Sequence, residues 1–165
     1  MITTGTLVPF ARRPQQAAPP TVVMHLLAAL AADPRNCVAL MSGRPAENLN
    51  RWFGTVRGMW RVAEHGAELK PPSVSAWEPL REQVPTDWKP TVMPILEHFM
   101  DRTPGSFVEE KKYSLVWHYR MADPEFGEWL ANELVSMLEA MLAQTELRAF
   151  RGEKTVEVKP VWANK

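Results

Sequence analysis

The chain has 165 residues, and its 19 basic and 19 acidic side chains give a formal net charge of zero. This balance argues against nucleic acid or an anionic membrane surface as a partner, so we expect any substrate to be small. The single cysteine, Cys37, excludes an internal disulfide, and no stretch approaches the roughly 18 apolar residues of a membrane span. We therefore expect a soluble cytoplasmic protein, long enough for one substantial core or two small lobes, with the Cys37 thiol in its core.

Strands and helices are predicted to alternate in the first half of the sequence. The apolar run 37–41 has the length and composition of a strand buried on both faces of a sheet. A predicted helix precedes this run, with an apolar stripe made of Val22, Val23, Leu26, Leu27 and Leu30. The predicted elements are a strand at 1–8, a helix at 21–32, a strand at 37–41, a helix at 45–53 and a strand at 60–64. This order is typical of an open α/β sheet.

The composition changes to Pro, Ser and Glu over residues 69–87, which predicts a crossover between domains with one helical turn near 77–82. A helix, a hairpin, a second helix and a second hairpin are predicted beyond it. The first helix is expected to bury Val92, Ile95, Leu96 and Phe99, and the hairpins to cover residues 106–120 and 145–159. The second helix begins at Asp123-Pro124, and its expected core residues are Phe126, Trp129, Leu130, Leu134, Met137, Leu138, Met141 and Leu142.

Ser42-Gly43-Arg44 follows the predicted strand 37–41 directly and precedes a helix that begins near Pro45. This order places a hydroxyl and backbone N–H groups at the carboxyl edge of the sheet, where anions bind in open α/β folds. Three common residues after a strand also make an ordinary turn. On the pattern alone, both interpretations stay open.

Residues 108–120 carry more reactive side chains than any other stretch of similar length. Strand alternation places Ser114, Val116, His118 and Arg120 on one face and Leu115, Trp117 and Tyr119 on the other. Pairing with residues 106–112 as a hairpin brings Glu109, Glu110, Lys111 and Lys112 beside the second strand. Such a face suits a sugar and a phosphate. The alternative is a solvated antiparallel sheet whose far face covers a helix.

Five segments, in a fixed order, resemble the trehalose-6-phosphate phosphatases, a family of the haloacid-dehalogenase-like superfamily. They are Gly5-Thr6-Leu7-Val8-Pro9, Ser42-Gly43-Arg44, Ala63-Glu64-His65-Gly66-Ala67, Glu109 to Arg120, and Val156-Glu157-Val158-Lys159-Pro160 with Asn164-Lys165. The resemblance covers nearly the whole chain. It implies an α/β protein with a partial Rossmann-like haloacid-dehalogenase core at residues 1–71, an inserted α/β cap domain at 72–159 and the start of a return to the core at 160–165.

The resemblance implies a Mg²⁺-dependent phosphomonoester hydrolase that converts trehalose 6-phosphate to trehalose. It assigns Ser42 and Lys165 to the phosphoryl group, and to the substrate Arg44, Glu109, Lys111, Ser114, His118, Arg120 and Glu157. The chain departs from the family at the first motif, where Ile2 and Thr4 replace the nucleophilic and acid/base aspartates. Neither residue can serve as a phosphoryl acceptor or a magnesium ligand.

The remaining acidic residues of the family's metal site are expected beyond Lys165, so we expect a fragment or degenerate copy that binds no Mg²⁺ and is inactive alone. Three functional hypotheses stay open. In the first, the chain is part of a trehalose-6-phosphate phosphatase. In the second, it is a non-catalytic domain that binds a sugar phosphate or regulates a trehalose-phosphate synthase to which it is fused or which it partners. In the third, it is a related phosphatase that acts on another sugar phosphate. No nucleic acid or membrane is expected among its partners.

Overall fold

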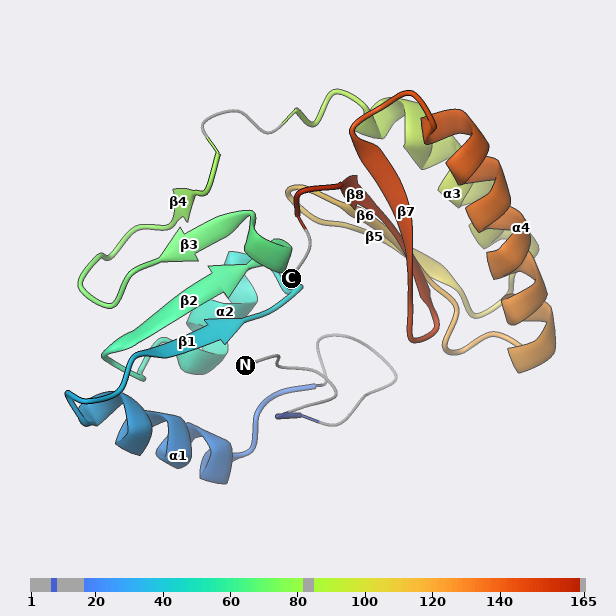
Figure 1. Cartoon of the computed structure of the whole chain (residues 1–165). Helices are drawn as coiled ribbons and strands as arrows, with labels where there is room; N and C mark the ends of the chain where they lie inside the picture. Colours follow the sequence, from blue (N-terminus) through green and yellow to red (C-terminus); the bar gives the residue numbers. More distant parts are fainter. Residues whose placement is uncertain (1–6, 9–16, 82–84, 164–165) are drawn as a thin grey trace. The chain divides into compact units, whose positions relative to one another are not determined.

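The computed structural model describes residues 7–8, 17–81 and 85–163 (Figure 1). The described residues form two compact units, one within Met1–Glu82 and Ala163–Lys165 and the other within Gln83–Trp162. Each unit joins a four-stranded sheet to helices, so the predicted α/β class is confirmed. Most of the strand predicted at residues 1–8 lies outside the described residues.

The first unit contains the alternating elements that the sequence predicts. Its sheet has the order β1-β2-β3-β4; β1 and β2 are parallel, and the other pairs are antiparallel. Because β1 and β2 are parallel and joined through α2, the turns that follow both strands lie at the same edge of the sheet. The elements are α1 (Thr21–Ala32), β1 (Val38–Met41), α2 (Ala46–Phe53), β2 (Met59–Ala63), a 3₁₀ turn (Glu64–Gly66), β3 (Glu68–Lys70) and β4 (Glu78–Pro79).

Helices α1 and α2 share one hydrophobic cluster with β1 and β2, built around Leu27, Leu40, Leu49, Phe53 and Met59. The predicted burial of β1 on both faces is wrong, because Ala39 is exposed while Leu40 is fully buried. The prediction that Cys37 lies in the core is also wrong, since the cysteine is exposed just before the strand. Small apolar side chains can occupy a strand that is covered on one face only, so the composition of residues 37–41 does not show whether one face or both faces are buried.

Two further predictions for this unit are wrong. Helix α1 buries Leu27, with Val23 and Ala31 packed beside it, whereas Val22, Leu26 and Leu30 are exposed. Apolar residues surround this helix on nearly every side, so its periodicity cannot select the buried stripe. The helical turn predicted near 77–82 is replaced by β4, whose backbone pairs with β3. Strand pairing over a distance has overridden the weak local preference.

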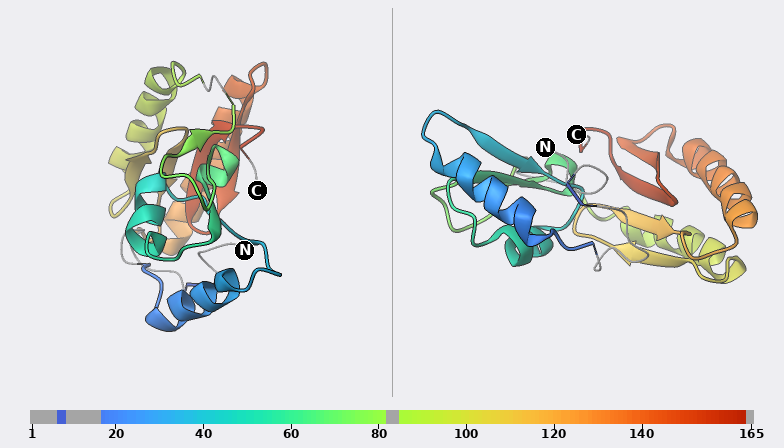
Figure 2. Two further views of the ribbon diagram at one scale, coloured as in Figure 1. Left: turned by 90° about the vertical axis from the view of Figure 1, so that its left-hand side faces the viewer. Right: turned by 90° about the horizontal axis from the view of Figure 1, so that it is seen from below.

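The second unit is an antiparallel sheet covered on one face by two helices, as the views in Figures 1 and 2 agree. The predicted hairpins are both present, and their inner strands β6 and β8 pair with each other to give the order β5-β6-β8-β7. The elements are α3 (Lys89–Arg102), β5 (Phe107–Glu110), β6 (Leu115–His118), α4 (Pro124–Leu142), β7 (Leu147–Gly152) and β8 (Thr155–Pro160).

The core of this unit lies between the sheet and the helices. It is formed by Val92, Leu96, Phe99, Leu115, Trp117, Tyr119, Leu130, Leu134, Leu138, Val156 and Val158. Helix α4 is as long as predicted, and Asp123 caps it by accepting from the backbone N–H groups of Glu125 and Phe126. The prediction that all its large apolar residues are core is wrong, because Phe126, Trp129, Met137 and Met141 are exposed. Neighbouring residues on a helix diverge by about 100°, so the inward-facing Leu130, Leu138 and Leu142 leave Trp129, Met137 and Met141 outside. Phe126 lies on the same row as Leu130 but in the first turn of the helix, where it is exposed.

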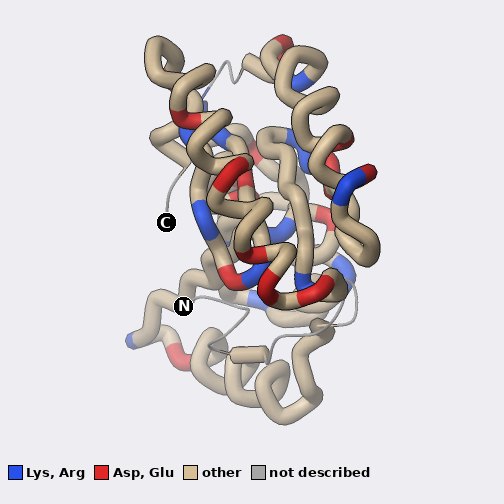
Figure 3. The backbone as a smooth tube through the Cα atoms, turned by 90° about the vertical axis from the view of Figure 1, so that its right-hand side faces the viewer, with Lys and Arg blue, Asp and Glu red and all other residues tan. Residues whose placement is uncertain are grey.

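Acidic and basic positions are interspersed along the backbone (Figure 3), in keeping with equal numbers of both signs. Within the described ranges, no helix combines the length and the hydropathy needed to cross a bilayer.

Candidate functional site

The turn that contains Ser42 is bonded to the turn that follows β2. Ser42 donates its backbone N–H to the Val62 carbonyl (2.9 Å) and accepts from the His65 N–H (2.9 Å). The Arg44 carbonyl accepts from the Glu64 N–H at 3.0 Å, and the Arg44 N–H donates to the Ser42 hydroxyl at 3.2 Å. Ser42, Arg44 and Glu64 are all buried. These bonds fix the hydroxyl of Ser42 at the carboxyl edge of the sheet, where the sequence predicted it.

Gly43 and the Glu64-His65 pair give this site an unusual backbone. Glu64 has φ +42° and His65 has φ +60°, values that non-glycine residues rarely adopt. A Cβ at Gly43 would lie 2.3 Å from Nε2 of His65, so only glycine fits against the imidazole. Strained residues of this kind concentrate at functional sites. Residues 63–67 are among the segments that carry the family resemblance, but nothing in the sequence placed them against Ser42.

A second group of polar residues lies on the face of the second sheet that α3 and α4 do not cover. The pairing places Glu109, Val116, Glu157 and Phe150 in one row across the four strands. The neighbouring row contains Phe107, His118 and Thr155. Glu110, which alternates to the other face, forms an ion pair with Lys89 at the start of α3 (3.0 Å). We call the side of β5, β6 and β8 that faces away from α3 and α4 the polar face.

Glu157 is the centre of a cluster on the polar face that also contains Lys111, Ser114 and Lys159, and we call it the Glu157 cluster. Its Oε1 accepts from Nζ of Lys111 at 3.1 Å and from the Ser114 hydroxyl at 2.9 Å. Its Oε2 lies 3.4 Å from Nζ of Lys159. The side chains of Lys111, Glu157 and Lys159 are only 11%, 11% and 4% exposed. Charge pairs that are this well buried are weakly screened by solvent and hold their geometry firmly.

The hairpin itself positions Lys111 and Ser114, because the Lys111 N–H donates to the Ser114 carbonyl (2.9 Å) across the turn between β5 and β6.

The second contact group on the polar face is the pair of Glu109 and His118, whose Oε2 and Nε2 atoms lie 2.8 Å apart. The His118 imidazole stacks on the Phe107 ring with their centroids 4.5 Å apart. The stacked ring fixes the imidazole and, through it, the Glu109 carboxylate.

Arg120 lies apart from the Glu157 cluster. Ser114 precedes β6 and Arg120 follows it in a turn, so the predicted continuation of the strand as far as Arg120 is wrong. Nη2 of Arg120 donates to the backbone carbonyl of Glu153 at 2.8 Å, in the turn between β7 and β8. Of the predicted substrate residues in the second unit, Glu109, His118 and Glu157 lie on strands of one sheet, and Lys111, Ser114 and Arg120 lie in the turns that flank β6 or follow β5. They form two contact groups, with Arg120 at a third position. Lys165, Ile2 and Thr4 lie outside the described residues.

Lys159 is a member of the Glu157 cluster that the sequence analysis did not single out. Its ammonium group also lies over the Phe150 ring, 4.7 Å from the centroid. Strand alternation contained the signal, because Lys159 is two residues after Glu157 and must therefore share its face.

The residues that the structure describes do not assemble a magnesium site, and the residues at positions 2 and 4 cannot serve as its ligands. Ile2 and Thr4 offer no carboxylate, and Mg²⁺ is held in proteins by carboxylate and other oxygen ligands in octahedral geometry. Over residues 7–8, 17–81 and 85–163, no group of three His, Cys, Asp or Glu side chains could hold a metal ion. We therefore assign no chemical step of this chain to a metal.

Known proteins resemble the chain over nearly its whole length. A sequence model of the family described as "Trehalose-phosphatase" matches residues 3–165. A trehalose-phosphatase of Schizosaccharomyces pombe is 39% identical over 162 residues, which cover 98% of this chain and 20% of that protein. The protein of Dictyostelium discoideum named alpha,alpha-trehalose-phosphate synthase [UDP-forming] B is also 39% identical, over 98% of this chain and 20% of its own length.

Solved structures also resemble the chain in fold. The C-terminal domain of trehalose-6-phosphate phosphatase from Candida albicans superposes with a TM-score of 0.95 at 32% identity, covering 99% of this chain and 57% of that one. A haloacid dehalogenase-like hydrolase from Bacteroides thetaiotaomicron, with a TM-score of 0.64 at 14% identity, covers 97% of this chain and 70% of that one, and shares the fold alone. The haloacid-dehalogenase-like fold is therefore confirmed. The chain spans about a fifth of the curated relatives and just over half of the Candida domain.

Proposed function

Because the chain belongs to the trehalose-phosphatase family, we propose that its polar face recognises the disaccharide of trehalose 6-phosphate, in a protein that hydrolyses this compound to trehalose. The Glu157 cluster carries the proposal. A sugar hydroxyl donates one hydrogen bond and accepts others, so a surface that reads it needs carboxylate acceptors beside ammonium donors. Glu157 with Lys111 and Lys159 supplies both kinds of group in fixed positions.

The other predicted residues take complementary roles in this proposal. Glu109 is an acceptor held by His118, Ser114 orients the Glu157 carboxylate, and Arg120 is a multi-donor group for hydroxyl oxygens. Ser42, with Arg44 beside it, is proposed to hold the phosphoryl group, and Lys165 is assigned there by resemblance. Phosphoryl transfer depends on such fixed, charge-neutralising donors more than on covalent help from the protein.

Magnesium supplies charge neutralisation in phosphatases of this class, as the resemblance implies. Since Ile2 and Thr4 do not fit that ion, we propose that these 165 residues bind the substrate without hydrolysing it. We further propose a cytoplasmic location, which a single unpaired cysteine supports.

A second candidate function is a non-catalytic sugar-phosphate-binding or regulatory domain attached to, or partnering, a trehalose-phosphate synthase. Two observations favour it. Positions 2 and 4 lack the carboxylates of a phosphatase, and a relative at 39% identity carries the name of a synthase. Recognition of trehalose 6-phosphate by the polar face is common to both candidates. They differ in whether the complete protein releases phosphate.

Calorimetric titration with trehalose 6-phosphate tests the proposed recognition. Lys111→Ala removes a charged donor from the Glu157 cluster, and we expect it to raise the Kd at least about tenfold, since a hydrogen bond to a charged group contributes about 1.5–3 kcal/mol. The matched control is Lys112→Ala, which removes the exposed neighbouring ammonium that lies over the Tyr113 ring. We expect its Kd to stay within about threefold of the wild type.

Three outcomes would contradict this account. The first is that the wild-type chain binds no trehalose 6-phosphate, and the second is that the two lysine variants lose affinity equally. The third is that glucose 6-phosphate binds as tightly as trehalose 6-phosphate. The last outcome would favour a different sugar phosphate as substrate. Phosphate release by the same samples, with and without a chelator, separates hydrolysis from binding alone.

A further inference from the structure

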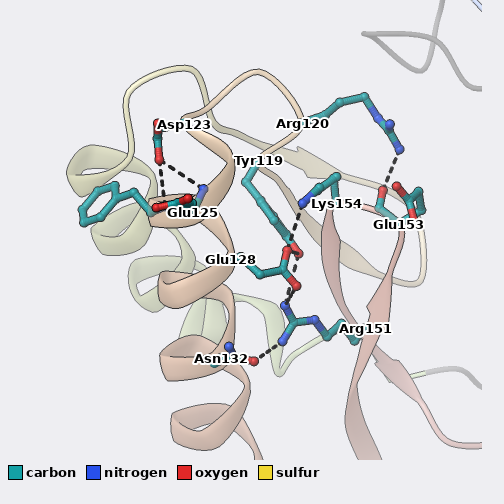
Figure 4. A network of polar contacts seen from close by, with 10 residues as sticks. Tyr119, Arg120, Asp123, Glu125, Glu128, Asn132, Arg151, Glu153 and Lys154 are labelled. Atoms are coloured by element: carbon teal, nitrogen blue, oxygen red, sulfur yellow. Dashed lines mark hydrogen bonds and ion pairs between the residues drawn. The ribbon is translucent and has the colours of Figure 1, made fainter.

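A compact ionic cluster on the helix side of the second sheet has no part in the proposed polar face (Figure 4). Its centre is Glu128 in the first half of α4. Oε2 of Glu128 accepts from Nζ of Lys154 at 3.1 Å and from the Tyr119 hydroxyl at 3.2 Å. Its Oε1 accepts from the guanidinium of Arg151, which also donates to the Asn132 side chain. One carboxylate thus ties α4 to the ends of three strands.

The turn between β7 and β8 depends on this cluster. Lys154 has φ +61°, a left-handed conformation that is unfavourable for a lysine. Its side chain is held by Glu128, and its carbonyl accepts from the Tyr119 N–H at 3.1 Å. The strained residue is therefore fixed from both sides, by α4 and by the segment that ends β6.

Arg120 is the next residue after Tyr119, and it contacts the same turn. Its Nη2 donates to the carbonyl of Glu153, the residue immediately before Lys154 (Figure 4). The position of that carbonyl is set by the conformation of Lys154, because consecutive peptide groups move together. A path of two hydrogen bonds, joined by the peptide link between Glu153 and Lys154, therefore leads from Glu128 through the turn to the guanidinium of Arg120.

We propose that Glu128 is a positioning residue for Arg120, which it orients by holding the β7–β8 turn against α4. The proposal rests on the proposed function in one respect, since there Arg120 is a sugar-binding donor. It adds a residue that contacts no substrate and that no sequence motif marks.

The protonation states favour the cluster at neutral pH. The hydrogen bond from Lys154, followed by the charge of Arg151, lowers the pKa of Glu128, so its carboxylate is ionised. Burial raises the pKa of Tyr119, so its hydroxyl keeps the proton that it donates. The Glu128 side chain is 45% exposed, and a single pair at such exposure would be weak. Three donors converging on one carboxylate hold it more firmly than any one of them would.

The simpler interpretation is that Glu128 only stabilises the unit, as many surface ion pairs do. Glu133 provides a matched control, because it lies on the same helix and pairs with Arg102 of α3 at 3.4 Å, without contacting the turn. A purely structural role predicts similar consequences for Glu128→Gln and Glu133→Gln. A positioning role predicts that only Glu128→Gln affects Arg120.

The test is calorimetric titration of trehalose 6-phosphate into the folded chain, in four variants. We expect Glu128→Gln to raise the Kd about three- to tenfold and Glu133→Gln to leave it unchanged. In a chain that already carries Arg120→Ala, we expect Glu128→Gln to have no further effect, since coupled residues are non-additive. An unchanged Kd for Glu128→Gln, or the same fold-change with and without Arg120, would overturn the proposal.

A second measurement, which needs no ligand, tests the role of Glu128 independently of the proposed function. Exchange of the Arg120 Nε–H with solvent, followed by ¹⁵N NMR without ligand, is expected to be faster in Glu128→Gln than in the wild type or Glu133→Gln. If the wild type binds no trehalose 6-phosphate, the proposed function fails while this exchange still decides the role of Glu128. Equal exchange in all three proteins would refute the positioning role.

Discussion

Trp117→Ala is expected to lower the free energy of unfolding of the second unit by about 3–5 kcal/mol, the usual cost of removing a buried large aromatic side chain. Trp117 lies on the inner strand β6, fully buried, with its ring stacked on Tyr119 and edge-on to Phe99. Its indole N–H donates to the Ser106 hydroxyl at 3.2 Å, so the one polar atom of this side chain is paired in the wild type. The substitution creates a cavity where the sheet meets both helices.

The control for Trp117→Ala is Trp129→Ala, which removes the same side chain from the exposed side of α4, where it is 57% accessible. We expect the control to cost at most about 0.5 kcal/mol, as for most surface substitutions. Urea denaturation followed by circular dichroism gives both values. Equal losses would mean that the core of the second unit lies elsewhere than between β6 and the helices.

Glu157→Gln is expected to weaken both stability and ligand binding. It keeps the shape of the side chain but removes the charge shared by Lys111 and Lys159, and disrupting a buried ion pair costs about 3 kcal/mol. Because the same carboxylate is proposed to accept from a sugar hydroxyl, we expect the Kd for trehalose 6-phosphate to rise at least about tenfold. Denaturant titration and calorimetry on the same preparation measure the two effects.

Glu146→Gln is the matched control for Glu157→Gln, since Glu146 is exposed just before β7 and its backbone carbonyl, which the variant retains, accepts from Val161. We expect this control to behave as the wild type in both measurements. A Glu157→Gln chain with wild-type affinity would remove Glu157 from the sugar-binding surface, even if its stability fell as predicted.

The sequence predicted the regular elements best where periodicity was clear. Helix α4 and both hairpins were anticipated because Asp123 caps the helix and apolar residues alternate in the strands. It failed for β4, whose two residues form a strand only through pairing with β3. It also failed for the buried side of α1, since a helix with apolar residues on most sides gives no directional signal.

The candidate site was predictable only in part, for a related reason. Lys111, Ser114 and Glu157 were anticipated, but their clustering depends on the register between β6 and β8, which no local pattern contains. Glu128 gave no signal at all, because one glutamate on an amphipathic helix is ordinary until the fold brings the β7–β8 turn to it. Long-range register and turn placement decide such contacts, and both are properties of the folded chain.

The central claim is that the polar face binds trehalose 6-phosphate. Amide chemical shifts of the ¹⁵N-labelled chain, recorded while trehalose 6-phosphate is added, test this claim most directly. The predicted result is a set of saturating shifts at Glu109, Lys111, Ser114, His118 and Glu157, with the exposed side of α4 around Trp129 unaffected. Shifts confined to residues 42–44, or spread over α4 without change on β5, β6 and β8, would contradict the account.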